Sequence, residues 1–424
     1  MWKFPDPIGW IPPGDAGQAL MRFIIASLNL EDAQKTAHIF REILEPYKNN
    51  LGWHFKCLML LAKFFPHGFN ALFRIGTSLF FEKRFMAANG DTGIVLAVSR
   101  TSRQGLKTNF DILGEAVTSE KQAERYVQSY LALIRQLITC MPPHEISISL
   151  KPSAFYSQIQ AAAPEHSAEV IAKRLEPIIA LLKKIGGHAY LDAEESEMLE
   201  VQKLVFKILY LKYGSAVRFV LQAYLKSSFH TLKWLVSINN PDDPIHFRLV
   251  RGAYWDHECM RAERLNWDET PVYTDKDETD LMYHTLIWQG MRHGLVVNLG
   301  THNIISIANS INSYISMRAW GFECSIPEFQ MLHGMPGVKE FGKILCQKGY
   351  SVRIYSPVIY PEGETREGMA YLVRRILENQ SQMSFLVQHS GTKMREAVGI
   401  LQKIPARKDL PDIIKQIRIP KEAA

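Results

Sequence analysis

From about residue 95 onward, the chain alternates between short segments rich in β-branched and aromatic residues and longer segments with helical spacing. Eight such strands, each followed by a helix, over roughly 280 residues indicate an α/β fold of the TIM-like (β/α)₈ barrel type. A doubly wound open sheet is the alternative, but no Gly-x-Gly-x-x-Gly follows any strand. The predicted strands are Thr108–Leu113, Ile146–Lys151, His188–Asp192, Val217–Ala223, His246–Arg251, Val296–Thr301, Phe322–Phe329 and Tyr350–Tyr355. The predicted helices include Lys121–Thr139, Ala168–Lys184, Glu195–Tyr213, Asp280–His293 and Gly363–Asn379.

The chain divides into three predicted parts. Residues 1–95 form an N-terminal helical arm, residues 96–392 form the barrel, and residues 393–424 form a short tail that contains three prolines. Within the arm, the segment His54–Lys83 is rich in Phe and Leu. That segment either packs as core, the interpretation that we favour, or presents a surface to a membrane or partner.

Composition excludes several classes of protein. The five cysteines are scattered and no Cys-x-x-Cys occurs, so neither a disulfide framework nor a zinc site is indicated and a reducing compartment is expected. The net charge of +6 comes without a Lys/Arg-rich run or a nucleic-acid motif, which argues against nucleic acid but fits loose attraction to an anionic membrane surface. The start lacks a secretory apolar region, and the longest uncharged run, Gly294 to Met317, is too polar for a transmembrane helix. We therefore expect a cytoplasmic protein.

Polar residues follow most of the predicted strands. Functional groups of a barrel gather at the C-terminal ends of its strands, so we expect these residues at one face. Each also has an ordinary interpretation, as a solvated lysine, as acids at a helix N-terminus, as a satisfied core pair or as rim packing. These residues are Lys151, Asp192 with Glu194 and Glu195, Gln222, Arg248, Tyr254 with Trp255, His302 with Asn303, and Tyr355.

Two adjacent arginines, Arg374 and Arg375, lie in the apolar segment Tyr371–Asn379 that reads as a late helix. Paired guanidinium groups can hold a carboxylate or phosphate bidentately, although a lone pair is commonly a solvated basic patch. No His with a nearby carboxylate indicates a metal site, and no nucleophile elbow or Ser/Cys triad occurs. What remains is a cationic pocket lined by aromatic residues, which suits a small anionic substrate beside a large, flat cofactor.

These motifs are similar to those of a known family. The chain resembles the proline dehydrogenases, flavoenzymes with a distorted (β/α)₈ barrel, and most of all the barrel part of the bifunctional bacterial proline utilisation A enzymes. The resemblance runs from about Phe110 to Phe385, and we expect neither an aldehyde dehydrogenase domain after it nor a DNA-binding domain before it. The matching motifs are Asp111–Ala116, Leu191–Glu195, Arg248–Asp256, Thr301–Asn303, Phe329–Met335 and Tyr371–Asn379.

The resemblance implies a set of site residues. It makes Lys151, Asp192, Tyr355, Arg374 and Arg375 the catalytic residues, with Lys151 and the two arginines holding the substrate carboxylate. It encloses the substrate ring with Leu249, Tyr254, Leu332 and Tyr371. It assigns FAD binding to Gln222, Arg248, Val250, Gly252, Ala253, Trp255, Lys276, Thr301, His302, Asn303, Glu378 and Phe385, with Arg248 near the flavin N5. No metal is implied.

The implied reaction is hydride transfer from C5 of L-proline to flavin N5, which gives Δ1-pyrroline-5-carboxylate. Implied partners are a membrane quinone as electron acceptor, a peripheral contact with the inner face of the cytoplasmic membrane, and a separate pyrroline-5-carboxylate dehydrogenase downstream. The alternatives are a 4-hydroxyproline dehydrogenase and a flavin-free binding protein on the same barrel. The oligomer, the quinone, the role of the arm, the completeness of the chain and the acceptor of the proline nitrogen's proton stay open.

Overall fold

The computed structural model describes residues 32–85, 87–114, 116–335, 337–361 and 392–417, with isolated positions between residues 16 and 30. These residues fall into two compact units, one formed by residues 32–85 and the other by residues 87–361 together with 392–417. The second unit therefore takes in α15 (Thr392–Lys403) and α16 (Leu410–Ile417). These two helices pack on α12 (Ile304–Ala319) and α13 (Val338–Gln347) of the barrel.

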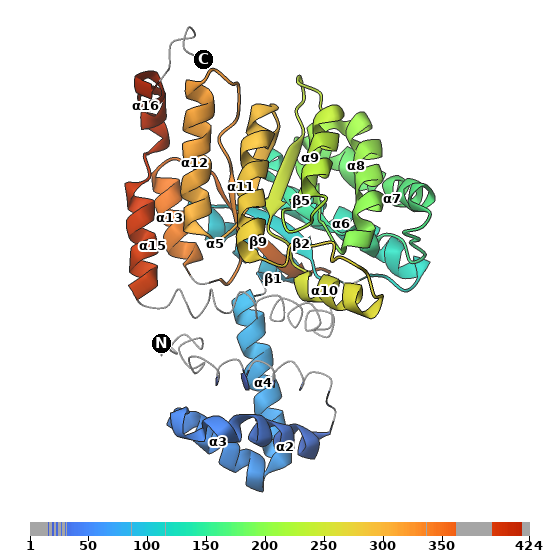
Figure 1. Cartoon of the computed structure of the whole chain (residues 1–424). Coiled ribbons are helices and arrows are strands. Elements are labelled where there is room, and N and C mark those ends of the chain that lie inside the picture. Colours follow the sequence, from blue (N-terminus) through green and yellow to red (C-terminus); the bar gives the residue numbers. More distant parts are fainter. Residues whose placement is uncertain are drawn as a thin grey trace. The chain divides into compact units, whose positions relative to one another are not determined.

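The larger unit is a closed parallel barrel, so the open doubly wound sheet is excluded (Figure 1). Eight strands pair in sequence order, and β9 pairs with both β8 and β2, which closes the ring. A two-residue strand, β1 (Ala88–Asn89), adds to the end of β9. The barrel strands are β2 (Lys107–Ile112), β3 (Ser147–Leu150), β4 (His188–Leu191), β5 (Val217–Gln222), β6 (His246–Val250), β7 (Val296–Gly300), β8 (Phe329–Leu332) and β9 (Val352–Ile359).

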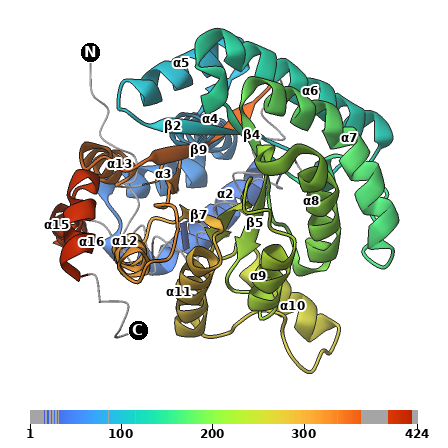
Figure 2. The same cartoon turned by 90° about the horizontal axis from the view of Figure 1, so that it is seen from above.

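Helices surround the strands, as Figure 2 shows from above. Because a barrel strand alternates its side chains between interior and exterior, the outward residues form a continuous apolar layer with these helices. Phe219, Phe247 and Val297, for example, are almost completely buried. The helices of this unit are α5 (Gly90–Ser102), α6 (Glu120–Cys140), α7 (Pro164–Ile185), α8 (Leu199–Tyr213), α9 (Ser228–Ser237), α10 (Trp255–Arg264), α11 (Lys276–Arg292), α12 (Ile304–Ala319) and α13 (Val338–Gln347), with α15 and α16.

One predicted strand is misplaced. The sequence predicts a strand over 322–329, whereas β8 begins at Phe329 and ends at Leu332. Residues 323–328 have no regular structure, and Pro327 lacks the backbone N–H that a central strand must donate. The apolar residues before Pro327 therefore gave a strand signal in a loop, and the real strand is only four residues long.

A buried ion pair stands near the beginning of the barrel's last two strands. Glu328, just before β8, accepts from Arg353 of β9 with Nε–Oε1 and Nη2–Oε2 distances of 2.7 and 3.1 Å. Burial alone would raise the pKa of Glu328, but the charge and hydrogen bonds of Arg353 outweigh it and lower that pKa to about 2. This pair ties β8 to β9 inside the barrel.

The smaller unit is helical and has an aromatic core. Phe23, Phe40 and Phe69 are fully buried, and the ring centroids of Phe40 and Phe69 lie 4.7 Å apart. The Phe-rich segment thus supplies part of this core through Phe69, although other apolar residues of the segment are exposed. The helices described in full for this unit are α2 (Ala33–Leu44), α3 (Trp53–Phe64) and α4 (Pro66–Phe85), with a short 3₁₀ turn at Glu45–Asn50.

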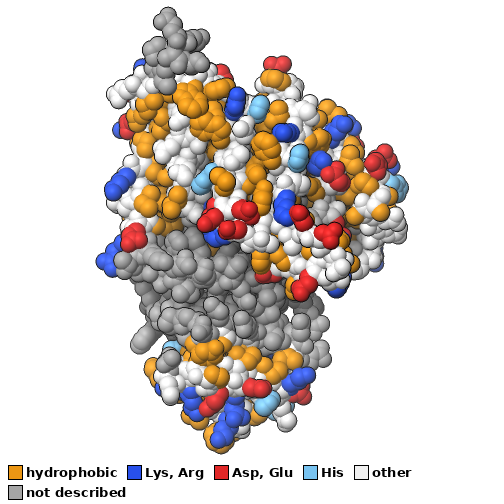
Figure 3. Space-filling model, viewed as in Figure 1, with side chains coloured by type: hydrophobic (Ala, Val, Ile, Leu, Met, Phe, Trp, Pro, Cys, Tyr) orange, Lys and Arg blue, Asp and Glu red, His pale blue; other side chains and the backbone are white. Residues whose placement is uncertain are grey.

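The surface of the smaller unit is mixed. Trp53, Phe64 and Phe65 are exposed, and Figure 3 shows hydrophobic side chains of this unit beside Lys, Arg, Asp and Glu on the face in view. Among the described helices of the whole chain, none is long and apolar enough to cross a membrane.

Candidate functional site

Five strands bring a continuous hydrogen-bonded chain of charged and polar groups to the C-terminal end of the barrel. Lys151 follows β3, and its Nζ lies 2.7 Å from both carboxylate oxygens of Asp111 on β2. The Oη of Tyr355 on β9 lies 2.8 Å from Oδ2 of Asp111 and 2.8 Å from Oδ2 of Asp192 after β4. Arg248 of β6 completes the chain, because its Nη1 donates to Oδ1 of Asp192 over 2.7 Å. The structure therefore joins four of the predicted site residues through Asp111.

Arg248 is held from several sides. Its Nε donates to Oε1 of Gln330 over 2.5 Å, its Nη1 also reaches Oγ of Ser149 at 3.1 Å, and its guanidinium lies 4.0 Å from the ring centroid of Tyr190. Its Nη2 is buried and has no hydrogen-bond partner among the residues that the structure describes. A buried guanidinium nitrogen without an acceptor is rare in proteins. Nη2 of Arg248 is therefore a donor that remains available to a ligand.

The loop after β6 comes unusually close to a neighbouring aromatic ring. Gly252 has a φ of +137°, and a Cβ at this position would overlap the ring of Tyr224, which is buried. The loop leads into α10, whose buried Glu258 accepts from the backbone N–H of Ser196 over 2.5 Å and from its Oγ over 2.7 Å. The first residue of α10, Trp255, donates its indole N–H to the carbonyl of Tyr273 over 2.8 Å. Glycine is thus required for this backbone path, which an adjacent helix then anchors.

The glycine predicts a stability effect that can be measured. We expect Gly252→Ala to cost about 1–3 kcal/mol for the backbone strain alone, with a further cost for moving Tyr224. Gly105→Ala is the matched control, because Gly105 also has a positive φ, +71°, but a Cβ added there would meet no atom within 4 Å. Urea unfolding of both variants measures the difference. Equal losses of stability would show that contact with Tyr224 does not matter.

The residues after β7 fix the start of α12. Asn303 caps that helix, since its Oδ1 accepts from the backbone N–H groups of Ile305 and Ser306 over 3.0 and 3.1 Å. Nε2 of His302 accepts the backbone N–H of Leu332 over 3.0 Å, which places the imidazole proton on Nδ1. Thr301 accepts through Oγ1 from Nη1 of Arg251 over 3.1 Å. These three residues therefore form an ordered edge of the site.

Glu194 is a buried carboxyl beside the same strands. It accepts from the backbone N–H of Ser153 over 3.0 Å and from the hydroxyl of Ser153, so it holds the loop that carries Lys151. Burial raises the pKa of Glu194 to about 7, against the opposing effect of the hydrogen bonds from Ser153. The backbone carbonyl of Glu194 accepts from Nε2 of Gln222 over 2.9 Å.

Some predicted residues are not part of this cluster. The strand alternation puts Leu249 on the same face as Phe247, which contacts α11 at Gly290, and Leu249 is fully buried there. Lys276, at the start of α11, pairs with Asp280 and is exposed. Tyr254, Leu332, Val250 and Ala253 are partly exposed around the strand ends. Tyr371, Arg374, Arg375, Glu378 and Phe385 lie outside the described residues.

The sequence did not identify Asp111, Gln330, Ser149 and Tyr190 as site residues. Asp111 lies in a predicted strand and is completely buried, and a charge at such a position needs a partner. The need of a buried carboxylate for a cationic partner could therefore have pointed to Asp111, although it does not identify which cation. Gln330 lies in the matching motif Phe329–Met335, but nothing in the sequence gives Gln330, Ser149 or Tyr190 a role in the site.

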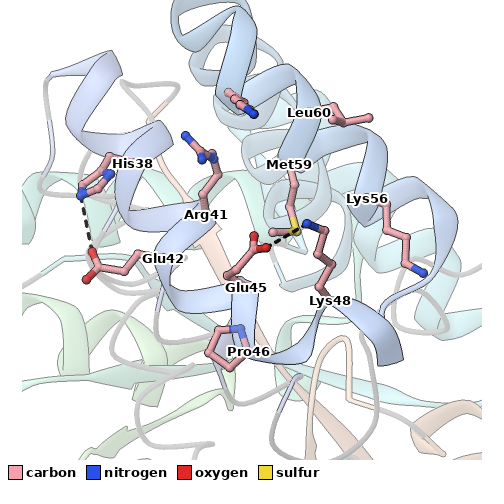
Figure 4. Close-up of a pocket in the computed structure, with 10 residues that line it drawn as sticks. His38, Arg41, Glu42, Glu45, Pro46, Lys48, Lys56, Met59 and Leu60 are labelled. Atoms are coloured by element: carbon pink, nitrogen blue, oxygen red, sulfur yellow. Dashed lines mark hydrogen bonds and ion pairs between the residues drawn. The ribbon is translucent and has the colours of Figure 1, made fainter.

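A groove in the smaller unit carries mixed charges. It has a volume of ≈ 830 Å³ and lies between α2 and α3, as Figure 4 shows. Two of its acids are already paired, Glu45 with Lys48 at 2.8 Å and Glu42 with His38 at 3.6 Å, and these four side chains are exposed. Such pairs on a surface contribute little energy. The groove therefore lacks the buried, converging polar groups that the barrel end has.

The fold and this geometry place the chain in the class of (β/α)₈ barrels whose polar site lies at the C-terminal ends of the strands. Comparison with known proteins gives the family. The proline dehydrogenase family profile matches residues 95–388, and the chain belongs to this family. Among the described residues, no group of three or more His, Cys, Asp or Glu could hold a metal ion.

Three similar proteins illustrate the relation. The bifunctional protein PutA of Escherichia coli is 30% identical over 311 residues, which cover 70% of this chain and 23% of that protein. The proline dehydrogenase of Deinococcus radiodurans is 27% identical over 307 residues, covering 72% of this chain and 88% of that protein. The crystal structure of proline utilization A from Bdellovibrio bacteriovorus, inactivated by N-propargylglycine, has a TM-score of 0.73 and 26% identity and covers 95% of this chain and 41% of that one. The chain thus spans under a quarter of the length of the E. coli relative.

Proposed function

We propose that the chain is an FAD-dependent dehydrogenase that oxidises L-proline at C5 to Δ1-pyrroline-5-carboxylate. The observation that carries the proposal is the buried chain from Lys151 through Asp111, Tyr355 and Asp192 to Arg248 at the barrel end. These residues include cations that can bind the carboxylate of an amino acid and carboxylates that can accept hydrogen bonds from its amine. The match to the proline dehydrogenase family supports the same substrate.

The described residues fit a flavin. The unpartnered Nη2 of Arg248 offers a donor to an electronegative ring atom, and Gly252 lets the loop after β6 follow a positive-φ path beside Tyr224. Arg248, Gly252, Trp255 and the edge Thr301–Asn303 would hold the cofactor. FAD supplies a hydride acceptor when bound. The protein residues hold and orient the substrate, which is the contribution of proximity.

A spectrum tests the proposal. Protein reconstituted with FAD should show the yellow flavin absorbance, and anaerobic addition of L-proline should bleach it. N-propargylglycine, which inactivates the Bdellovibrio relative, should inactivate this chain as well. A protein that takes up no flavin, or a bound flavin that L-proline leaves oxidised, would contradict the proposal.

The electron acceptor that we propose is a membrane quinone, reached by a peripheral contact with the inner face of the cytoplasmic membrane. A separate pyrroline-5-carboxylate dehydrogenase would consume the product. 4-Hydroxyproline is the alternative substrate, but the hydroxyl of Tyr355 is fixed by two aspartates, which keeps the phenol ring in place against a 4-hydroxyl group. The ratio of kcat/KM for the two amino acids separates these substrates.

The predicted carboxylate clamp gives a second test of this function. Replacing Arg375 by Met should raise KM for L-proline at least tenfold, because a hydrogen bond between charged groups contributes about 1.5–3 kcal/mol. Steady-state kinetics with a dye acceptor measures KM. Arg407→Met, on the outer surface next to Tyr350, is the control and should leave KM unchanged. An Arg375→Met enzyme with KM within twofold of wild type would refute the clamp.

A further inference from the structure

The hydroxyl of Tyr355 lies between two carboxylates. Its Oη is 2.8 Å from Oδ2 of Asp111 and 2.8 Å from Oδ2 of Asp192. A tyrosine hydroxyl has one hydrogen and can donate it to only one of them. The second separation becomes a hydrogen bond when the other carboxyl is protonated and donates to the tyrosine oxygen. The three groups together therefore have a place for one additional proton.

The charges around Asp111, Tyr355 and Asp192 favour an exchange of protons with a bound substrate. Asp111 is paired with the ammonium of Lys151 and Asp192 with the guanidinium of Arg248, so the two acids and two bases balance. A proton that moves from a substrate ammonium to Asp192 leaves the total charge of the site unchanged. No net charge then has to be buried, which is the expensive step in a barrel interior.

Within the hydrogen-bonded series Asp111–Tyr355–Asp192, Asp192 is the group at which a proton can enter. Asp111 is 0% exposed and Tyr355 6%, whereas Asp192 is 9% exposed. Lys151 donates to both oxygens of Asp111 as an ammonium, which has no lone pair to offer. Glu194 is the other carboxyl nearby, but both its oxygens accept from Ser153. Within the described part of the chain, the titratable groups around Asp192 are thus Asp111, Lys151, Glu194, Arg248 and Tyr355, with the phenols of Tyr130 and Tyr190.

We propose that the Asp111–Tyr355–Asp192 chain accepts the proton that the secondary ammonium of the substrate must lose, and that Asp192 receives it. The N–H bond breaks and its electron pair stays on nitrogen, while a lone pair of Asp192 Oδ2 forms the new O–H bond. Asp192 then donates to Tyr355, and Tyr355 donates to Asp111, so the two acids act as one coupled pair. No electron moves in this step and no further reactant is needed. The inference rests on the proposed proline oxidation.

The pH dependence of flavin reduction tests the proposal. In rapid mixing of the FAD-loaded enzyme with saturating L-proline, the wild-type rate should be nearly independent of pH around neutrality. Asp192→Asn should slow reduction about 10²–10⁴-fold, the usual contribution of a positioned base. Its rate should then rise about tenfold per pH unit, as expected when hydroxide must remove the proton. Asp192→Glu should restore the flat profile even if its rate is lower.

Several results would overturn the proposal. One is a wild-type reduction rate that itself rises tenfold per pH unit, and another is an Asp192→Asn rate that is reduced but independent of pH. A tenfold rise per pH unit in Glu194→Gln would also overturn it, because Glu194 would then be the acceptor. A flavin that L-proline reduces at no pH would instead contradict the proposed function. The two failures are therefore distinguishable.

A measurement on the unmodified sequence covers the case in which Asp192→Asn does not fold. The infrared difference spectrum of the holoenzyme should show a protonated carboxyl band on binding 5,5-dimethyl-L-proline, which has the ring nitrogen but no C5 hydrogen. The band should shift when aspartate is labelled with ¹³C and stay unchanged when glutamate is labelled. A bound analogue without this band, or a band that follows the glutamate label, would refute the inference.

Discussion

Replacement of Arg248 by Met should lower kcat/KM for L-proline by about 10²–10³-fold, the usual loss when one preorganised electrostatic donor is removed. Arg248 has two connections that Met cannot replace: the 2.7 Å bond to Asp192 and the buried Nη2, which we assign to the flavin. The first sets the charge of the proton-accepting chain. The second would stabilise negative charge on the reduced cofactor. The flavin reduction potential should therefore fall in the variant as well.

Arg318→Met is the control for this experiment, since Arg318 pairs with Glu323 near the end of α12 and belongs to no part of the site. Its kcat/KM and flavin potential should match those of the wild type. Near-ultraviolet circular dichroism should show that both variants keep their tertiary structure. If Arg248→Met keeps kcat/KM within threefold of wild type, then Arg248 neither contacts the flavin nor supports Asp192 in catalysis.

The barrel was predictable because its signals are local. The strands β2 to β7 each lie within one or two residues of the predicted segment, since each is a short apolar run that a polar or glycine-containing turn interrupts. β8 was misplaced because an apolar loop before Pro327 carries the same signal as a strand. Local pattern alone cannot tell these two cases apart.

The candidate site was predictable only in part, because its connections are not local. Lys151, Asp192, Arg248 and Tyr355 could be named from strand ends and from the family resemblance. Asp111 could not, since its role depends on Lys151, 40 residues further along the chain, and on Tyr355, 244 residues further. Asn303 shows the opposite case: the site residue expected from the sequence is also a helix cap.

Glu328→Gln should lower the free energy of unfolding by about 3–5 kcal/mol, because it leaves the guanidinium of Arg353 buried without a counter-charge. Arg353 is 3% exposed, and its other described hydrogen bonds go to the backbone carbonyls of Thr108 and Glu145. Those carbonyls accept hydrogen bonds but carry no charge to balance the arginine. Urea unfolding at neutral pH measures the loss.

The pH dependence of stability distinguishes this explanation from a packing defect. The pKa of Glu328 is lowered from 4.5 to about 2 in the folded protein, so its contribution is present above the unfolded value and is lost as pH falls toward 2. Glu328→Gln should lack that part of the acid dependence. Glu323→Gln removes the same charge from an ion pair whose acid is 90% exposed, and it should cost less than about 1 kcal/mol. Equal losses in the two variants would mean that burial of the Glu328–Arg353 pair does not hold β8 to β9.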